Sequence, residues 1–415
     1  MKRFVIPLIG ILFLAAIFGG FYLFAKRDAL LRDALDTAEQ KASELIGTQV
    51  KIGNAFLEEF NISSLKDSAL ILDDIEIFDK DSALMAKVDR ARVTFKLLNF
   101  YDRGAGAIDE IEITGAQAFI KKRDDNSWNV QDIKVKESGE STFDAEINLT
   151  GGTVTAEFDG KNISVEKIEL SADCADMDAI ETELTAETLG SHISAKGTVG
   201  ANNQYINAVV DTADISKILP YIPEDIIPEG VEIHGGFAKN TAINISRRGE
   251  LLKYNGFTNF HDCAVKVEET EIENIAGSAT FTESKYDINA SAEANGQFAK
   301  VSGTIRTDTD EMYFDMNAES DSFAPAAVIE NIGIDGAASF TAHVFGTAND
   351  PKVEAKIFSN YLGYENLSAR NIQTDLRYNN NAVFLSNIYA DTDKKIYAEG
   401  VINNSKKPEF DIKVK

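Results

Sequence analysis

The sequence predicts a mainly β protein whose chain begins with two helices. Three observations lead to this fold class: an uncharged apolar run at the N-terminus, an apolar stripe with helical spacing directly after it, and a period of two through most of the remaining chain. With 415 residues, the chain is long enough for two or three ordinary domains or for one repetitive domain.

Residues 4–24 carry no charge and are flanked by Lys2-Arg3 and Lys26-Arg27. A helix of this length spans about 30 Å, which is the thickness of the hydrocarbon core of a bilayer. A cleaved signal peptide is the alternative, but its apolar region would be shorter, about 7–15 residues. Because the run is long and the next stretch is helical in pattern, we expect a retained anchor over residues 1–27. Since only Met1 and two basic residues precede the run, we expect the body to be exported. The anchor positions are Phe4, Leu8, Ile11, Leu14, Phe18 and Phe24.

Residues 28–47 predict an amphipathic helix. Its apolar side chains recur every three or four residues on one face: Leu31, Ala34, Leu35, Ala38, Ala42, Leu45 and Ile46. Asp28 is a suitable N-cap, and Gly47 stands where a left-handed C-terminal cap is expected. We expect the apolar stripe to cover the first end of a sheet.

From Val50 onward, apolar and polar residues alternate, which is typical of antiparallel strands with one face away from water. Turn residues at Gly151-Gly152, at Asp159-Gly160 and at positions 379–381 are expected to separate the strands. The apolar positions predicted to share the inner face are Val154, Ala156, Phe158, Val265, Val267, Ile288, Ala290, Val383, Leu385, Phe410, Ile412 and Val414.

An internal repeat of about 100 residues is visible in three similar strings, centred on Gly197, Gly303 and Gly400. The first two strings lead into short apolar segments, residues 215–219 and 325–332, which we predict to be short helices. We therefore expect an N-terminal β segment over residues 48–137 and repeated β-meander units over residues 138–415. Since the third copy stops where the others enter their helix, we expect the sequence to be the N-terminal part of a longer polypeptide.

The composition and motifs argue against several functions. The net charge of −26 argues against a nucleic-acid partner, because phosphate binding needs a basic surface. The four histidines show no metal-ligand spacing, and neither a Gly-x-Ser-x-Gly motif nor a phosphate loop occurs. We predict no enzyme, no catalytic residue, no metal and no cofactor. Cys174 and Cys263 are expected to be isolated apolar residues, with a disulfide as the alternative.

Four features in this order resemble the AsmA-like family and its TamB branch. The first is the anchor followed by an amphipathic helix, with the string at residues 47–53 at the end of that helix. The second is a strand pattern over residues 111–123 that runs into Asp124-Asp125-Asn126-Ser127-Trp128-Asn129, where the family has an r-x-x-d-g-x-w-n turn. The third is the repeated glycine strand, and the fourth is the string at residues 344–353, which is similar to G-T-x-x-x-P-x-V.

The resemblance implies an elongated antiparallel sheet curled into a trough, anchored in the inner membrane of a two-membrane bacterium with its body in the periplasm. It implies that the trough carries phospholipids between the inner and outer membranes. The residues alone leave open both a lined channel and a packed sandwich. The alternative functions are a scaffold for the assembly or secretion of outer-membrane proteins or autotransporters, and a structural envelope spacer. The C-terminal domain with which the family meets an outer-membrane barrel does not occur in this sequence.

Overall fold

The computed structural model of the protein describes residues 29–59, 67–96, 99, 107–133, 144–176, 178–200, 203–222, 227, 230–267, 269–309, 311–328, 334–347, 349–364, 367–379, 382–391, 395–403 and 409–414. The chain forms two compact units, one up to Asp211 with Asn244–Leu252, the other Thr212–Ile243 with Lys253–Lys415. The described part is mainly β, as predicted. The predicted anchor lies outside it. Within the described residues, no helix combines the length and the hydropathy needed to cross a bilayer.

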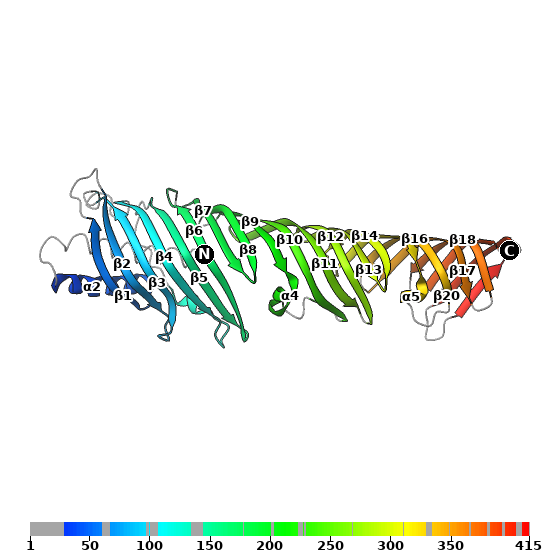
Figure 1. Ribbon diagram of the computed structural model, residues 1–415, viewed down its shortest axis with the longest axis horizontal. Helices are drawn as coiled ribbons and strands as arrows, with labels where there is room; N and C mark the ends of the chain where they lie inside the picture. The colour runs from blue at the N-terminus through cyan, green and yellow to red at the C-terminus, as the bar shows by residue number, and fades with distance from the viewer. Residues whose placement is uncertain are drawn as a thin grey trace. The chain divides into compact units, whose positions relative to one another are not determined.

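The first unit contains one long helix followed by strands that pair in chain order (Figure 1). The elements are α2 (Ala29–Ile46), β1 (Val50–Glu59), β2 (Ser68–Phe78), β3 (Leu84–Phe95), β4 (Ile108–Lys121), the 3-10 helix η3 (Asn129–Asp132), β5 (Glu146–Phe158), β6 (Lys161–Asp173), β7 (Ile180–Thr188), β8 (Ser191–Val199) and β9 (Asn203–Asp214).

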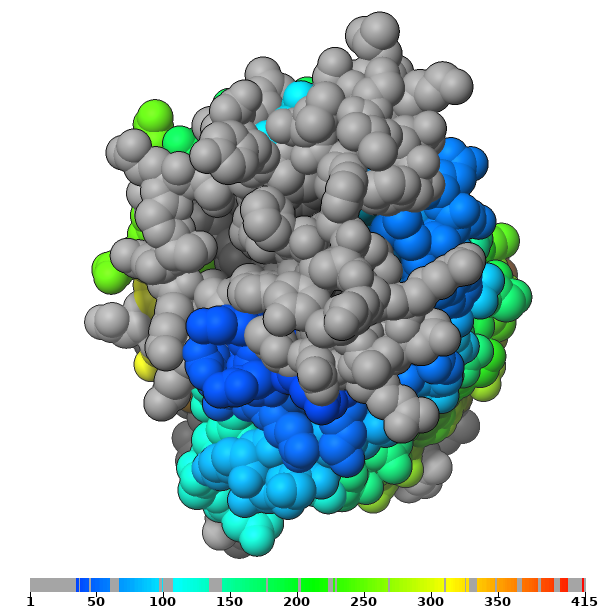
Figure 2. Space-filling model, turned by 90° about the vertical axis from the view of Figure 1, so that its left-hand side faces the viewer, coloured from blue at the N-terminus to red at the C-terminus, as the bar shows by residue number. Residues whose placement is uncertain are grey.

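Helix α2 occupies the range predicted for the amphipathic helix. Ala38, Ala42 and Ile46 are buried, and α2 contacts β1, so the stripe covers the first end of the sheet as expected. Figure 2 shows α2 directly against the first strands. Gly47 has a φ of 73°, and its N–H donates to the carbonyl of Ser43 at 2.9 Å, as the C-cap prediction requires. Asp28 and the side chains of Leu31, Ala34 and Leu45 lie outside the description.

The prediction of an antiparallel sheet throughout is wrong at one step. Strands β4 and β5 pair in parallel, with Ile111 beside Ile147. A parallel pair needs a crossover that returns the chain to the same end of the sheet. Residues 122–145, which include η3, make this connection, and they contain the turn motif at residues 124–129.

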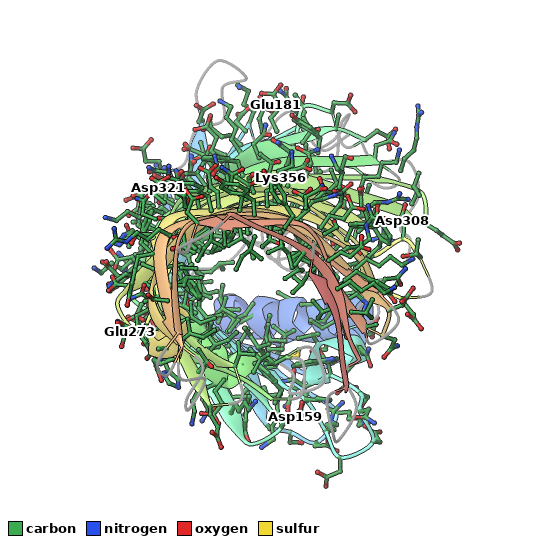
Figure 3. All side chains as sticks on the ribbon, turned by 90° about the vertical axis from the view of Figure 1, so that its right-hand side faces the viewer. Asp159, Glu181, Glu273, Asp308, Asp321 and Lys356 are labelled. Carbon is green, nitrogen blue, oxygen red and sulfur yellow. The ribbon has the colours of Figure 1, made fainter. Side chains whose placement is uncertain are left out.

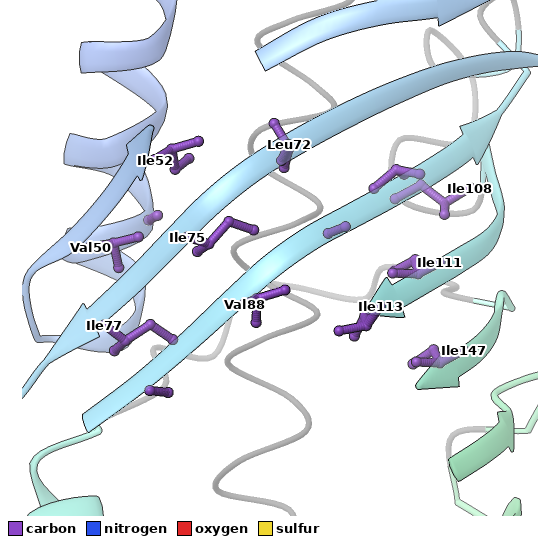
Figure 4. Close-up of a cluster of buried hydrophobic side chains, with 14 of the residues drawn as sticks. Val50, Ile52, Leu72, Ile75, Ile77, Val88, Ile108, Ile111, Ile113 and Ile147 are labelled. Carbon is purple, nitrogen blue, oxygen red and sulfur yellow. The ribbon is translucent and has the colours of Figure 1, made fainter. Parts of the chain in front are cut away.

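The buried core of the described residues lies in the first unit (Figure 4). Side chains of Leu70, Val93, Ile111 and Ile147 lie opposite one another across β2 to β5. Each of these four side chains is at most 3% exposed. Alternation thus places one face of these strands in a hydrophobic core.

The second unit consists of strands that again pair with their neighbours in the chain. Strands β9, β10 and β11 each have residues in both units, and Thr212–Asp214 of β9 belong to the second. The elements are α4 (Ile215–Ile218), the 3-10 helix η4 (Leu219–Tyr221), β10 (Val231–Arg248), β11 (Leu251–Val267), β12 (Thr270–Thr282), β13 (Lys285–Ala294), β14 (Gln297–Arg306), β15 (Tyr313–Phe323), α5 (Pro325–Val328), β16 (Ile334–Thr347), β17 (Pro351–Tyr364), β18 (Leu367–Asn379), β19 (Ala382–Asp391), β20 (Lys395–Asn403) and β21 (Glu409–Val414).

The repeat has a structural counterpart. Its three glycines lie in β8, β14 and β20, six strands apart each time, and the short helices α4 and α5 follow at equivalent places. A Cβ on Gly197 would overlap the carbonyl oxygen of Tyr205, and one on Gly303 would overlap that of Asp315. Glycine is therefore required because the neighbouring backbone approaches too closely for any side chain.

The prediction that Gly151-Gly152 separates two strands is wrong. Gly151, with a φ of 70°, forms a β-bulge inside β5, where the pairing with β6 shifts between Leu149 and Gly152. The bulge lets Leu149 and Val154 share one face although they are an odd number of positions apart. Asp159-Gly160 forms the turn between β5 and β6, as predicted. Asn380 and Asn381 lie outside the described residues.

Candidate functional site

The second unit has one apolar sheet face, defined here as the apolar face. Cross-strand partners share a face, so the pairing register identifies its members directly. One row across β13 to β20 consists of Ala290, Val301, Ala318, Ala342, Ala355, Leu376, Leu385 and Gly400. The next row, across β13 to β19, consists of Ile288, Gly303, Met316, Val344, Val353, Tyr378 and Val383. Among the described positions, neither row contains a charge.

The opposite face of the same strands is polar and charged. One of its rows consists of Lys300, Glu319, Thr341, Lys356, Asp375 and Ser386. Lys300 approaches Glu319 at 3.5 Å in an ion pair across two strands. In Figure 3, Glu273, Asp308, Asp321 and Lys356 lie on the side of the sheet where most of the nitrogen and oxygen atoms are drawn. The two faces of this sheet therefore have opposite chemistry.

The apolar face of the second unit is not packed into a core. Side chains such as Ala318, Ala342 and Leu376 are only half-buried. The buried hydrophobic residues described for this unit are few and small: Ala213, Cys263, Ala338, Ala382 and Ala390. In the part of the unit that the structure describes, no second layer of the chain covers the face.

The first unit also has an apolar side to its sheet, and the burial of the side chains on it changes along the sheet. From β5 to β9, one row consists of Leu149, Leu170, Leu184, Ala195 and Ala208, which are half-buried. Towards β1 to β4, the corresponding residues belong to the core and are covered. The face is thus closed near α2 and more open towards β9.

Most of the predicted inner positions can be placed. Val154 and Ala156 lie opposite Ala118 and Ile120, Val265 lies opposite Ile272, and Val267 is 39% exposed. Ile288, Ala290, Val383 and Leu385 belong to the two rows given above. Phe158 lies at a strand end, with its ring 6.2 Å from that of Trp128. The side chains of Phe410, Ile412 and Val414 lie outside the description, although their backbones pair with β20.

The alanines at positions 318, 342 and 355 were not predicted as members of the face. The signal was present in the alternation of residues 315–319, where Met316 and Ala318 stand between Asp315, Asn317 and Glu319. Alanine is too small and too common to make such a segment stand out.

An ion-pair cluster in the first unit was also not predicted. The Arg123 guanidinium lies 2.5 Å from Asp132, 3.3 Å from Asp79 and 3.2 Å from Asp81. Burial raises the pKa of Asp132, but hydrogen bonds from Arg123 and from the Lys80 N–H outweigh it, and the net pKa lies below the ordinary value. The cluster ties the crossover to the turn after β2.

Asn129 holds the same crossover against β4. Its amide nitrogen donates to the Phe119 carbonyl at 2.7 Å, and its amide oxygen accepts from the Lys121 N–H at 2.9 Å. Arg123 and Asn129 belong to the stretch that carries the family-like turn, and both have structural contacts here.

The titratable groups do not assemble a reactive site in the described residues. No group of three or more metal-binding side chains occurs among them. Cys174 and Cys263 are free and buried. Burial raises the pKa of the Cys174 thiol to about 11, which keeps it protonated and unreactive at neutral pH. A hollow of about 940 Å³ lies on the polar face, but its walls carry charges of both signs, including the paired Lys300 and Glu319.

Comparisons of this chain with protein-family models, with curated proteins and with solved structures found no match.

Proposed function

We propose that this protein carries phospholipids between the inner and outer membranes, anchored in the inner membrane with its body in the periplasm. The observation that supports this most is the apolar face of the second unit, which is half-exposed, free of charges in its two central rows, and backed by a charged face. A monomeric soluble protein rarely leaves a large contiguous apolar surface without a ligand or partner. Hydrocarbon chains match the chemistry of this surface.

In this mechanism the sheet curls around the acyl chains, and the head groups stay in water at its edge. The β-bulges favour such a curl, because a bulge bends the strand that contains it. Each methylene contributes about 0.8 kcal/mol wherever it lies on an apolar surface. A lipid therefore moves along the rows without a large barrier, and no discrete binding residue is needed. The resemblance to the AsmA-like and TamB proteins supports the same function.

The test compares two neighbouring substitutions on opposite faces. Ala342→Glu places a charge on the apolar face, whereas Thr341→Glu places the same charge on the polar face one residue away. The full chain is purified in mild detergent, and bound phospholipid is quantified by mass spectrometry. We expect at least a fivefold loss of phospholipid in Ala342→Glu and none in Thr341→Glu. Equal phospholipid in both variants, or none in the unsubstituted protein, contradicts the proposal.

Two further measurements, cross-linking and the folding of one variant, separate the alternative functions. An assembly scaffold would cross-link to outer-membrane proteins rather than to lipid. A packed spacer would unfold when Val267 is replaced by Asp, because a buried charge without a partner is strongly destabilising. Val267 is 39% exposed, so we expect this variant to remain folded.

A further inference from the structure

We propose that helix α2 is a displaceable plug at the β1 end of the first unit's sheet, on the side that carries Leu149 and the core residues of β1 to β4. Acyl chains reach β1 to β3 when the helix moves away. This inference rests on the proposed function and concerns how the same kind of face is loaded. Its basis is the way in which α2 is held.

Two side chains of α2 complete the free edge of β1. The Val50 N–H donates to Ser43 Oγ at 2.9 Å, and the Ile52 N–H donates to Glu39 Oε1 at 2.6 Å. Ser43 Oγ in turn donates to the Glu39 carbonyl at 2.7 Å. Since β1 pairs with β2 on its other side, these are the groups that an additional strand would otherwise bind.

The apolar stripe of α2 covers apolar side chains of β1 to β3 that a ligand would otherwise contact. Ala38, Ala42 and Ile46 belong to the same buried cluster as Ile75 and Val88 of β2 and β3. Two of these three helix residues are alanines, which each bury little apolar area, and Leu35 packs against the same cluster as a partly buried residue. Further along the unit, where α2 makes no such contact, the corresponding side chains are half-exposed.

The connection between α2 and β1 is suited to a change of angle. It begins at Gly47, whose φ of 73° is a conformation that glycine adopts without strain. Thr48 follows and is only 8% exposed, yet its hydroxyl has no hydrogen-bond partner among the residues that the structure describes. A buried hydroxyl without a partner is disfavoured, so the arrangement with α2 against β1 carries a free-energy cost at Thr48. Movement of α2 about this link would expose the hydroxyl to water.

The experiment uses the full chain, incorporated into phospholipid nanodiscs that contain a phospholipid with a diazirine in its acyl chain. Glu39→Ala with Ser43→Ala removes both edge contacts and keeps a strong helix former at each position. Gln40→Ala with Glu44→Ala is the control, because the described contacts of these side chains stay within α2: Gln40 donates to Glu44 at 3.1 Å, and Glu44 pairs with Lys41 at 3.7 Å. After illumination, mass spectrometry locates the labelled residues. We expect labelling of β1 to β3 to rise at least threefold in the first variant and to stay unchanged in the control.

A second variant tests the closed position directly. In Ser43→Cys with Val50→Cys, a disulfide or a short bismaleimide bridge holds α2 against β1. We expect labelling of β1 to β3 to fall below that of the unsubstituted protein. If neither variant changes this labelling while Ala342 and its row are labelled, α2 is not a plug and the proposed function stands. If no apolar face of either unit is labelled in any variant, the proposed function itself fails.

Discussion

At the residue scale, Arg123 forms ion pairs with three carboxylates while its own side chain is largely buried. Its side chain is 15% exposed, and those of Asp79 and Asp132 are 7% and 12% exposed. Removing the cation leaves two nearly buried carboxylates without their partner, which costs more than the pair itself contributes. The sequence showed only a turn motif here, because ion pairs between distant segments leave no local pattern.

We predict that Arg123→Met destabilises the first unit by about 2–3 kcal/mol, somewhat less than is typical of a fully buried pair. Urea unfolding followed by tryptophan fluorescence measures this, since Trp128 is the only tryptophan and lies in the same crossover. Arg90→Met is the matched control, because Arg90 pairs with Asp73 but is 54% exposed. An exposed pair contributes little. Equal effects of the two substitutions would contradict the cluster's role.

The same cluster predicts a pH dependence. Because the pKa of Asp132 is lowered in the folded state, its contribution is present above the unfolded value, about 3.9, and is lost as pH falls through the lower folded value. The stability difference between the unsubstituted protein and Arg123→Met should therefore be constant near neutral pH and shrink below about pH 4. Urea midpoints of both proteins between pH 7 and pH 3 test this. A difference that stays constant to pH 3 would exclude Asp132 as the partner that matters.

At the element scale, residues with positive φ at which the alternation shifts, among them the bulge residue Gly151, form a tier in the first unit. Asp74, Gly115, Gly151 and Lys167, in β2, β4, β5 and β6, all have positive φ values between 50° and 70°. Each marks a shift in the alternation of its strand. The strands thus change phase together and stay in register, which a single bulge would not allow.

Deletion of Gly151 tests whether the tier acts as a unit. Strand β5 would lose its bulge while β4 and β6 keep theirs, so half of β5 would be out of register with both neighbours. We predict a loss of at least about 2 kcal/mol, measured by urea unfolding. Insertion of one glycine after Gly160, in the turn between β5 and β6, is the control and should cost much less. Similar stabilities of the two variants would mean that the bulges are independent.

Alternation predicted the strands and the apolar face, and the two interruptions of the alternation at equivalent places of the repeat predicted the short helices, because all of these depend on local pattern. The bulge at Gly151 was mistaken for a turn, since a double glycine suits both and only the phase of Leu149 and Val154 distinguishes them. The parallel pairing of β4 with β5 left no local signal. The contacts of Asn129 with Phe119 and Lys121, which hold the crossover against β4, join segments with different secondary structure and also leave no local signal.

At the scale of the whole molecule, the two units differ in how their apolar faces are covered. Ile111 in the first unit is 0% exposed, whereas Ala342 in the second is half-buried. The sequence did not distinguish them, because both positions lie in similar alternating segments. Coverage depends on what packs above a face, and periodicity within a strand carries no information about that.

This difference predicts opposite responses to the same charge. Ile111→Glu should cost more than about 4 kcal/mol and prevent folding of the first unit, since the carboxylate would have neither water nor a partner. Ala342→Glu should leave the stability of the second unit within about 1 kcal/mol, because its side chain reaches solvent. Circular dichroism and limited proteolysis of the full chain measure both. If Ala342→Glu also unfolds, the face is packed and unsuitable for a mobile ligand.

The six-strand spacing of the repeat glycines sets a fixed increment of length. Neighbouring strands lie about 4.8 Å apart, so a block such as β15 to β20 lengthens its sheet by about 29 Å. Adding or removing one such block keeps every cross-strand partner on its proper side, because both ends of the block have the same direction and phase. A protein built in this way would therefore change the length of its sheet in whole steps of six strands.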